Sequence, residues 1–250
     1  MDEGISSISG ISQVLETCGI QNPSVWDLVK PGGILLKLDQ VTKVFGPSIV
    51  ALDHVSFQME RGDFCFLLGP NGSGKTTFLK LPTLEERPSE GEVVCHGFSS
   101  RTIGKRQIPH LRRKLGWISP EFPLMDDMDV FDNVALSLRI LSKREAQIKR
   151  QVGQVLEMVG LGGKGKILPG SLSSGDKQKA AIARAVVRSP WLLLADEPTT
   201  GLDQTNADEI LGLFKKINLL GTGVLVATQD SRLCPQNGAR IVKIDKGRLL

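Results

Sequence analysis

Several features that would place this chain in other protein classes are absent from its sequence. No run of apolar residues approaches the roughly 20 that a membrane-spanning helix requires. No basic segment followed by an apolar one, the pattern of a secretory signal peptide, opens the chain. The cysteines, Cys18, Cys65, Cys95 and Cys234, are widely spaced and form no C-x-x-C pair. We therefore expect free thiols in a reducing compartment and a cytoplasmic location.

A strong charge imbalance is also absent, since 31 basic and 27 acidic residues give a formal net charge of +4. This balance provides no electrostatic reason to expect nucleic-acid binding, and we predict none. Hydrophobic residues make up 40% of the chain and charged residues 23%, which is ordinary for a globular protein. At 250 residues the chain is near the upper limit for one hydrophobic core, so we expect one domain with two lobes.

The most informative segment that is present is a glycine-rich one at residues 69–77, Gly-Pro-Asn-Gly-Ser-Gly-Lys-Thr-Thr. It has the pattern G-x-x-x-x-G-K-[ST], whose glycines let backbone N–H groups approach phosphate oxygens. The pattern assigns Lys75 to the β- and γ-phosphates and the Thr76 hydroxyl to Mg²⁺. The alternative, a chance glycine-rich turn, is disfavoured because an apolar strand is predicted at 63–68 and a helix at 76–81. The predicted nucleotide-binding residues of this loop are Gly69, Pro70, Asn71, Gly72, Ser73, Gly74, Lys75, Thr76 and Thr77.

The rest of the chain predicts layers of two kinds around this loop. From Ile34 to the loop, short β runs, among them 35–38 and 41–45, predict a mostly antiparallel β lobe. After the loop, apolar strands at 191–195 and 223–228 alternate with helical patterns, which predicts a parallel sheet buried on both faces. Consecutive helical patterns with no strand between them predict a helical lobe, at about 120–188, inserted in this α/β core.

Two segments leave alternatives open. Residues 1–34 are rich in Ser and Ile and are predicted to be an extension of the domain at 35–250. They either contain a docking helix with one apolar face at 8–15 or are partly disordered. The basic stretch at 101–114 is either a patch for a membrane surface or an acidic partner, or the solvated face of a packed helix.

Polar residues follow two of the predicted parallel strands. Asp196 and Glu197 follow one strand directly, and Gln229 follows the next. Because ligands of parallel sheets bind at the carboxyl ends of the strands, we expect these residues to share one site with the glycine-rich loop. A carboxylate at Asp196 would hold Mg²⁺ beside Thr76, and Glu197 is placed to orient or deprotonate an attacking water.

Two further segments carry a resemblance to a known family. The segment Leu-Ser-Ser-Gly-Asp at 172–176 resembles the LSGGQ signature of ABC-type ATPases, and Glu-Pro-Thr-Thr-Gly-Leu-Asp at 197–203 resembles their D-loop. The order P-loop, signature, Walker B and D-loop is that of an ABC nucleotide-binding domain, and the resemblance covers residues 35–250. It implies an α/β P-loop ABC ATPase fold with a RecA-like parallel sheet core, an antiparallel β lobe and an inserted helical lobe.

The resemblance also implies that ATP and Mg²⁺ bind in a head-to-tail homodimer, in which the P-loop of one subunit faces the signature of the other. The signature would present backbone N–H groups and a helix N-terminus to the γ-phosphate. Phe45 falls where the family stacks an aromatic ring on adenine, and its alternative is a core position in the β lobe. The signature residues implied to bind nucleotide are Ser173, Ser174, Gly175 and Asp176.

Within the superfamily, the segments 108–116, 130–135 and 193–199 most resemble the FtsE family of cell-division ATPases. This implies an integral membrane partner, FtsX for FtsE or an ABC permease otherwise, and a peripheral location on the inner face of the cell membrane. Lipoprotein-export and MacB-type ATPases share much of the same sequence, so the ATPase subunit of a lipoprotein or small-molecule exporter is an alternative. An ABC protein acting on DNA or ribosomes is disfavoured, because the chain has neither a long coiled coil nor a tandem copy.

Four positions depart from the family pattern. Ser174 replaces a glycine, Asp176 replaces glutamine or glutamate, Pro120 stands at the Q-loop glutamine, and Gln229 stands at the H-loop histidine. Proline has neither a side-chain donor nor an N–H. Gln229 can donate a hydrogen bond to the γ-phosphate, but it cannot exchange a proton near neutral pH. We hypothesise that ATP binding is retained and hydrolysis weakened; a nucleotide-dependent switch or scaffold is the alternative of another class.

Overall fold

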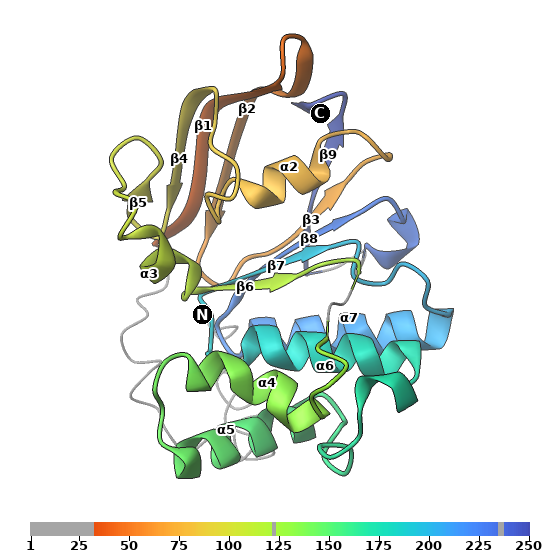
Figure 1. The fold of residues 1–250 in the computed structure, drawn as a ribbon. Coiled ribbons are helices and arrows are strands. Elements are labelled where there is room, and N and C mark those ends of the chain that lie inside the picture. The colour runs from red at the N-terminus through yellow and green to blue at the C-terminus, as the bar shows by residue number, and fades with distance from the viewer. Residues whose placement is uncertain (1–32, 122–123, 235–237) are drawn as a thin grey trace, which may run out of the picture.

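The computed structural model describes residues 33–121, 124–234 and 238–250, and it arranges them as two β-sheets and a group of helices (Figure 1). The first sheet has four strands in the order β2-β1-β4-β5, and every neighbouring pair is antiparallel. Its strands are β1 (Ile34–Phe45), β2 (Ile49–Glu60), β4 (Glu90–Cys95) and β5 (Phe98–Ser99). This sheet is the antiparallel lobe that the short β runs predict.

One detail of this lobe differs from the sequence prediction. The two apolar runs at 35–38 and 41–45 belong to a single strand, β1, rather than to two short ones. The register with β2 shifts between Leu38 and Val41, where Gln40 has a positive φ of 48°. A local irregularity inside a long strand therefore has the same sequence pattern as a turn between two short strands.

The second sheet has six strands in the order β10-β9-β3-β8-β7-β6. All neighbouring pairs from β9 to β6 are parallel, and β10 forms a hairpin with β9. Every residue of β7 and β8 is buried, which agrees with the predicted burial of the sheet on both faces. The strands are β3 (Phe64–Leu68), β6 (Leu115–Ile118), β7 (Leu192–Asp196), β8 (Gly223–Thr228), β9 (Arg240–Asp245) and β10 (Arg248–Leu249).

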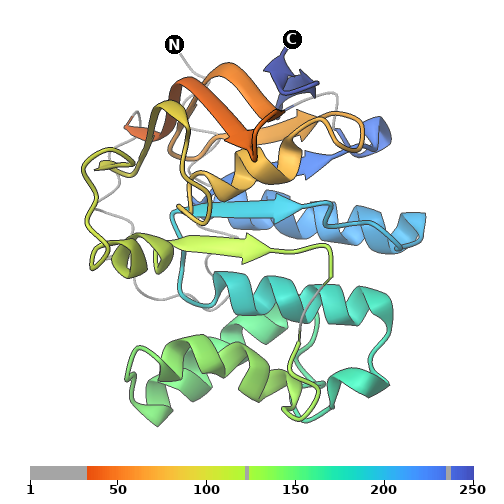
Figure 2. The same cartoon turned by 45° about the horizontal axis from the view of Figure 1, so that its top comes forward.

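The helices cover this sheet in two groups. Helix α2 lies between the two sheets and shares one apolar core with them, whereas α4, α5, α6 and α7 form a second core on the opposite face of the six-stranded sheet. Figure 2 shows α6 directly beneath the sheet and α4 and α5 farther from it. The helices are α2 (Lys75–Lys80), α3 (Ile108–Arg112), α4 (Val130–Arg139), α5 (Glu145–Met158), α6 (Ser174–Val186) and α7 (Gln204–Leu219), with short 3₁₀ turns η2 (Pro169–Ser171) and η3 (Ser231–Leu233).

The inserted helical lobe consists of α4, α5 and the outer part of α6, which follow one another between β6 and β7 in the chain. In the basic stretch at 101–114 only α3 is helical; Leu111 is buried there, whereas Arg101, Lys105 and Arg106 are exposed. Residues 1–32 lie outside the described part of the chain, so the extension and its possible helix at 8–15 stay predictions. None of the described helices is long and apolar enough to cross a bilayer.

Candidate nucleotide-binding site

The glycine-rich loop connects the carboxyl end of β3 to the N-terminus of α2. Its first glycine, Gly69, donates its N–H to the carbonyl oxygen of Thr228 at 3.1 Å, and a Cβ at this position would lie 2.2 Å from the carbonyl oxygen of Ile244. Gly74 has a φ of 103°, and a Cβ there would lie 2.4 Å from the carbonyl oxygen of Ala51. Both glycines of the motif are therefore required by close backbone approach, and one also by its backbone conformation.

Lys75 is held inside the loop that precedes it. Its side chain is 6% exposed, and Nζ donates to the carbonyl oxygens of Gly69 at 2.8 Å and Pro70 at 3.0 Å. The same ammonium lies 3.2 Å from Oε1 of Glu197, with which it forms an ion pair. These contacts fix a buried positive charge at the mouth of the loop, where phosphate oxygens would replace the carbonyl oxygens as its partners.

Thr76 and Asp196 meet across the gap between α2 and β7. The Thr76 hydroxyl donates to Oδ2 of Asp196 at 2.6 Å, and the carboxylate is 3% exposed. Burial raises the pKa of Asp196 above its ordinary value of 3.8, and the charge of Glu197 adds to this, although the hydrogen bond from Thr76 acts in the opposite direction. Oδ1 of Asp196 is buried and has no hydrogen-bond partner among the described residues. A hydroxyl beside a carboxylate with a free buried oxygen is a set of donors that fits Mg²⁺.

Glu197 lies immediately after β7 in a backbone conformation that is uncommon for residues other than glycine. Its φ is 46°, its N–H donates to the carbonyl oxygen of Ala227 at 2.9 Å, and its own carbonyl oxygen accepts the N–H of Thr200 at 3.2 Å. Such a conformation costs of order 1–3 kcal/mol and persists where surrounding contacts hold it. The carboxylate is thereby directed at Lys75, on the same side of the sheet as the glycine-rich loop.

The signature segment forms the N-terminus of α6. The Ser173 hydroxyl caps the helix by accepting the N–H of Asp176 at 3.1 Å, and Ser173 and Ser174 are exposed. Burial acts to raise the pKa of the Asp176 carboxyl, but Lys164, whose Nζ lies 2.6 Å from Oδ2, outweighs it and lowers the pKa. No hydrogen bond or ion pair in the described part of the chain joins these residues to the glycine-rich loop, so no polar bond connects the two predicted halves within one subunit.

The remaining predicted site residues lie at the ends of strands. Phe45 is half-buried at the end of β1, and Nζ of Lys43 lies 4.6 Å from its ring centroid. It is not among the residues of the two apolar cores, which weighs against the alternative of a core position. Pro120 and Gln229 are exposed after β6 and β8. The carboxyl ends of β3, β8 and β7 therefore carry the glycine-rich loop, Gln229 and the Asp196–Glu197 pair on adjacent strands, as the sequence predicts.

One support of the loop was not predicted. The backbone oxygen of Ser73 accepts the N–H of Gly247 at 3.0 Å, and the carbonyl oxygen of Gly247 accepts the N–H of Asp53 at 2.9 Å. The β9–β10 turn thus joins the loop to β2. Arg248 adds an ion pair with Asp53 beside it. The positive φ of Gly247, 79°, is the local sign of this turn, but its position against the loop depends on residues far apart in the sequence.

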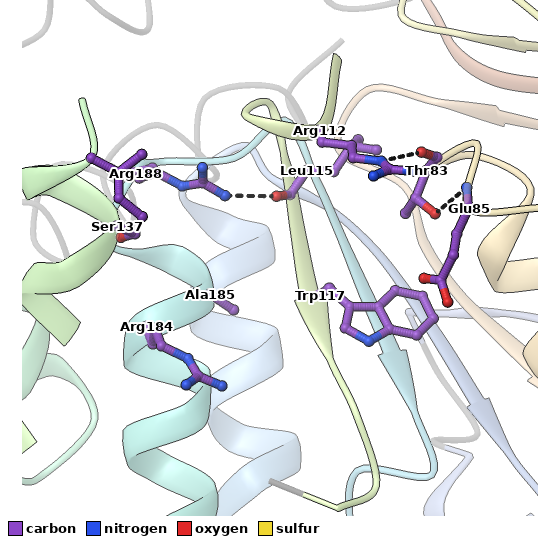
Figure 3. A pocket seen from close by; sticks show the side chains of 10 residues that line it. Thr83, Glu85, Arg112, Leu115, Trp117, Ser137, Arg184, Ala185 and Arg188 are labelled. Atoms are coloured by element: carbon purple, nitrogen blue, oxygen red, sulfur yellow. Dashed lines mark hydrogen bonds between the residues drawn. The ribbon is translucent and has the colours of Figure 1, made fainter. Parts of the chain in front are cut away.

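A second feature lies at the outer edge of the six-stranded sheet, where a cavity of about 360 Å³ is bounded by β6, α4 and α6 (Figure 3). Three arginines line it. Arg112 donates to the carbonyl oxygens of Thr83 at 2.9 Å and of Leu84 at 3.1 Å, and Arg188 donates to that of Leu115 at 3.3 Å. Burial lowers the pKa of both Arg184 and Arg188.

The comparisons with known proteins agree with this geometry. The profile of the family described as ABC transporter matches residues 52–200. The chain is 42% identical over 218 residues to the cell division ATP-binding protein FtsE of Mycobacterium tuberculosis, covering 87% of this chain and 95% of that protein. It is 40% identical over 215 residues to FtsE of Escherichia coli, covering 86% and 97%.

Among solved structures, the chain is similar to the ATP-binding cassette MJ0796 in a dimeric post-hydrolysis state bound to ADP and Pi. The TM-score is 0.77 and the sequence identity is 32%, and the match covers 86% of this chain and 96% of that one. A second relative is cbiO1 of Clostridium perfringens, part of the ABC transporter complex cbiONQ, with a TM-score of 0.80 and 26% identity over 87% of each chain. The predicted fold and the resemblance to FtsE are thus confirmed. The chain belongs to the ABC transporter family, as an ATPase similar to the FtsE proteins.

Proposed function

We propose that this protein is the ATP-hydrolysing subunit of a membrane complex and binds Mg-ATP in a head-to-tail homodimer. The observation that carries the proposal is the convergence of Lys75, Thr76, Asp196 and Glu197 at the carboxyl ends of neighbouring strands. Lys75 and Asp196 are buried, and burying an ammonium and a carboxylate in one place is costly unless they serve a common ligand or each other. Here one carboxylate oxygen is left without a partner among the described residues, which favours a ligand.

Each residue then has a role in phosphoryl transfer to water. The backbone N–H groups of 69–77 bind the phosphates, and Lys75 neutralises charge on the β- and γ-phosphates. Thr76 and Asp196 would hold Mg²⁺, which supplies further charge neutralisation when bound. The Glu197 carboxylate orients the attacking water and accepts its proton. Gln229 donates a hydrogen bond to the γ-phosphate, and Phe45 stacks on adenine.

The second half of the site comes from another copy of the chain. Ser173 and Ser174 are exposed, and they stand at the N-terminus of a helix of 13 residues. The Ser173 hydroxyl takes the N–H of Asp176, and the other N–H groups of a first helical turn have no partner within the helix and can bind an anion. Ser173 and Ser174 have no hydrogen bond to the glycine-rich loop of the same subunit within the described residues. A P-loop from a second subunit would bring the γ-phosphate to them, and the MJ0796 relative is itself a dimer in the state bound to ADP and Pi.

The membrane partner is proposed to be of the FtsX type, with the protein held at the inner face of the cell membrane, because the FtsE relatives are named for cell division. We assign its docking site to the arginine-lined cavity of Figure 3. Among the described residues that line it, Glu85 is the only acidic one, and it already pairs with Lys80 at 2.8 Å. A carboxylate on a cytoplasmic segment of the partner would complement Arg188, whose burial disfavours its charged form and whose Nε is buried without a hydrogen-bond partner among the described residues.

A hydrolysis-impaired switch is the second candidate, and Pro120 and Gln229 favour it. Both are exposed at strand ends where the family carries a glutamine and a histidine. Neither Pro120 nor Gln229 can take part in proton exchange near neutral pH. A protein of this kind would bind ATP, dimerise and brace its partner while turning ATP over slowly.

The test is ATP binding and turnover by the purified protein, alone and with its membrane partner in detergent or vesicles. We expect binding in both conditions and turnover that rises with the partner. Tight binding without turnover in either condition selects the switch, and absence of ATP binding contradicts both candidates. For docking, Arg188→Gln is compared with Arg139→Gln, whose arginine pairs with Asp132 on the exposed side of α4. Only the first is expected to reduce recovery of the partner with the protein.

A further inference from the structure

The signature helix α6 is joined to the segment that carries Glu197 by a buried glutamine. Gln178 is 0% exposed, and its Nε2 donates to the carbonyl oxygen of Pro198 at 2.5 Å. Its Oε1 is also buried and has no hydrogen-bond partner among the described residues. An apolar side chain of similar size would avoid this unsatisfied acceptor, so packing alone does not account for an amide here.

The carbonyl that Gln178 binds belongs to the turn that orients Glu197. Pro198 follows Glu197 directly, and the positive φ of Glu197 must be held by its surroundings. Glu197 is fixed on one side through its N–H, which binds the carbonyl oxygen of Ala227 on β8. The Gln178 amide fixes the other side from α6. The direction of the Glu197 carboxylate, toward Lys75, therefore depends on where α6 lies.

Two more contacts join α6 to α7, the helix that follows this segment. A Cβ at Gly175 would lie 2.2 Å from Oδ1 of Asn206, so the backbone of α6 lies directly against the Asn206 side chain at the start of α7. Nζ of Lys179 lies 2.6 Å from Oε2 of Glu209 on α7. Gly175, Gln178 and Lys179 are three and four residues apart and share one face of α6, which lies alongside α7 in Figures 1 and 2.

We infer that Gln178 is a positioning residue that sets the Glu197 carboxylate according to the position of the signature segment in the same subunit. The inference rests on the proposed function, in which Ser173–Asp176 contacts the ATP held by the second subunit. ATP that draws the N-terminus of α6 toward the second subunit then acts through Gln178 on the turn at Pro198. ATP bound at one site thereby changes the position of Glu197, the general base, at the other site.

The test compares three substitutions in the full-length chain. Gln178→Leu removes the donor at similar volume, and Gln178→Glu keeps a donor only while the new carboxyl is protonated. Lys179→Met is the matched control, because it removes an α6–α7 contact without touching Pro198. We expect Gln178→Leu to lower kcat by on the order of 10²-fold with KM for ATP within about twofold, since misplacement of a reacting group by about 1 Å costs this much. The control is expected to retain kcat within about twofold.

The pH profile separates positioning from packing. Burial raises the pKa of a carboxyl, so the Gln178→Glu variant carries the donor at low pH and loses it as pH rises. Its kcat relative to the wild type is expected to fall with rising pH toward that of the leucine variant. A ratio that stays constant with pH would overturn the inference. Should Gln178→Leu fail to fold, this comparison within one variant still decides the question.

A readout without turnover separates this inference from the proposed function. The turn after Glu197 contains the bonds Thr200 N–H to Glu197 and Leu202 N–H to Thr199. Hydrogen exchange of the peptide 197–203 is expected to be faster in Gln178→Leu than in the wild type or in Lys179→Met. Unchanged exchange contradicts the role of Gln178, whereas absence of turnover in the wild type with exchange altered as expected contradicts only the proposed function.

Discussion

The two halves of the proposed ATP site differ in how far one chain assembles them. In the P-loop half, Lys75 and Asp196 are 6% and 3% exposed, and each is bonded to other residues of the same half. In the signature half, Ser173 and Ser174 are exposed and form no bond with the loop within the described residues. The P-loop half is thus assembled within one chain, whereas the signature half is exposed on the surface.

The physical reason for this difference is charge. A buried ammonium and a buried carboxylate must be paired within the subunit, because burying them alone costs several kcal/mol each. Free N–H groups at an exposed helix N-terminus are solvated and carry no such cost. In the proposed dimer, the chain therefore holds Asp196 and Glu197 in place while a second copy completes the site. Substitutions in the P-loop half should therefore affect turnover, whereas substitutions in the signature half should affect dimerisation.

The largest expected effect is in the P-loop half, from Glu197→Gln. The amide cannot accept the proton of the attacking water, so turnover should fall by on the order of 10²–10⁴-fold. ATP affinity should stay within a few-fold, because Lys75 and Thr76 are unchanged. Phosphate release and equilibrium binding of ATP measure the two quantities. Glu157→Gln, at an exposed carboxylate of α5, is the control. Equal losses of binding and turnover would contradict a separate role for Glu197.

In the signature half, Gly175→Ala should weaken dimerisation and leave ATP binding by the monomer unchanged. The added Cβ would lie 2.2 Å from Oδ1 of Asn206, so the Asn206 side chain or the N-terminus of α6 must shift. Overpacking typically costs about 1–3 kcal/mol, or roughly 5–150-fold in an equilibrium constant. We expect ATP-dependent dimerisation to weaken by this factor while the monomer binds ATP as before.

Analytical ultracentrifugation in the Glu197→Gln background, where ATP is retained, measures that dimer constant. Gly153→Ala on α5 is a matched control, because its Cβ would meet no atom within 4 Å. Dimerisation that is unaffected by Gly175→Ala would show that the signature segment does not face the second subunit.

A third, smaller effect concerns Gln229, at the border between the halves. Gln229→His supplies a group that exchanges protons near neutral pH, so we expect faster turnover. The gain should reach at most ~10²-fold, the lower end of the range for a positioned acid–base group. The gain should fade below about pH 6.5 as the imidazole is protonated. Turnover that Gln229→Ala leaves unchanged would count against any catalytic role for Gln229.

The P-loop half was predictable from sequence because its determinants are local. The spacing within 69–77 and the apolar strands ending at Leu68 and Asp196 define it, and the parallel sheet then brings the strand ends together. The signature was recognised only by resemblance, since among the described residues Ser173 and Ser174 form no hydrogen bond with the glycine-rich loop.

The missed contacts are all long-range. The bond from Gly247 to Ser73 and the bond from Gln178 to Pro198 join segments whose proximity only the folded chain defines. The sequence prediction for β1 was also wrong. The interruption between its two apolar runs is typical of a turn, but in the structure it is an irregularity at Gln40, whose φ is positive, inside one strand. Patterns with a period of two or 3.6 residues carry no information on such contacts.

The smallest expected effect concerns the free energy of unfolding, which the buried Asp196 carboxylate of the P-loop half lowers in the protein without nucleotide. Burial, the first cause, raises the pKa of Asp196 above 3.8. A carboxyl with a higher pKa in the folded chain than in the unfolded one binds protons better when folded, so its contribution to the free energy of unfolding decreases as pH rises from about 3.8 through the raised pKa. At neutral pH the ionised Asp196 therefore destabilises the free protein.

Asp196→Asn removes this charge, while its amide oxygen can still accept the Thr76 hydroxyl proton. The variant should unfold at a higher temperature than the wild type at pH 7 without nucleotide, by about 2–4 °C for each kcal/mol of penalty removed. The difference should shrink as pH falls toward 4. With Mg-ATP the order should reverse, because ligand binding stabilises only the protein that still binds it tightly. Thermal unfolding at several pH values, with and without Mg-ATP, tests both signs. A variant less stable than the wild type without nucleotide would mean that Thr76 and Lys75 already compensate the buried charge, so that the P-loop half is assembled without cost.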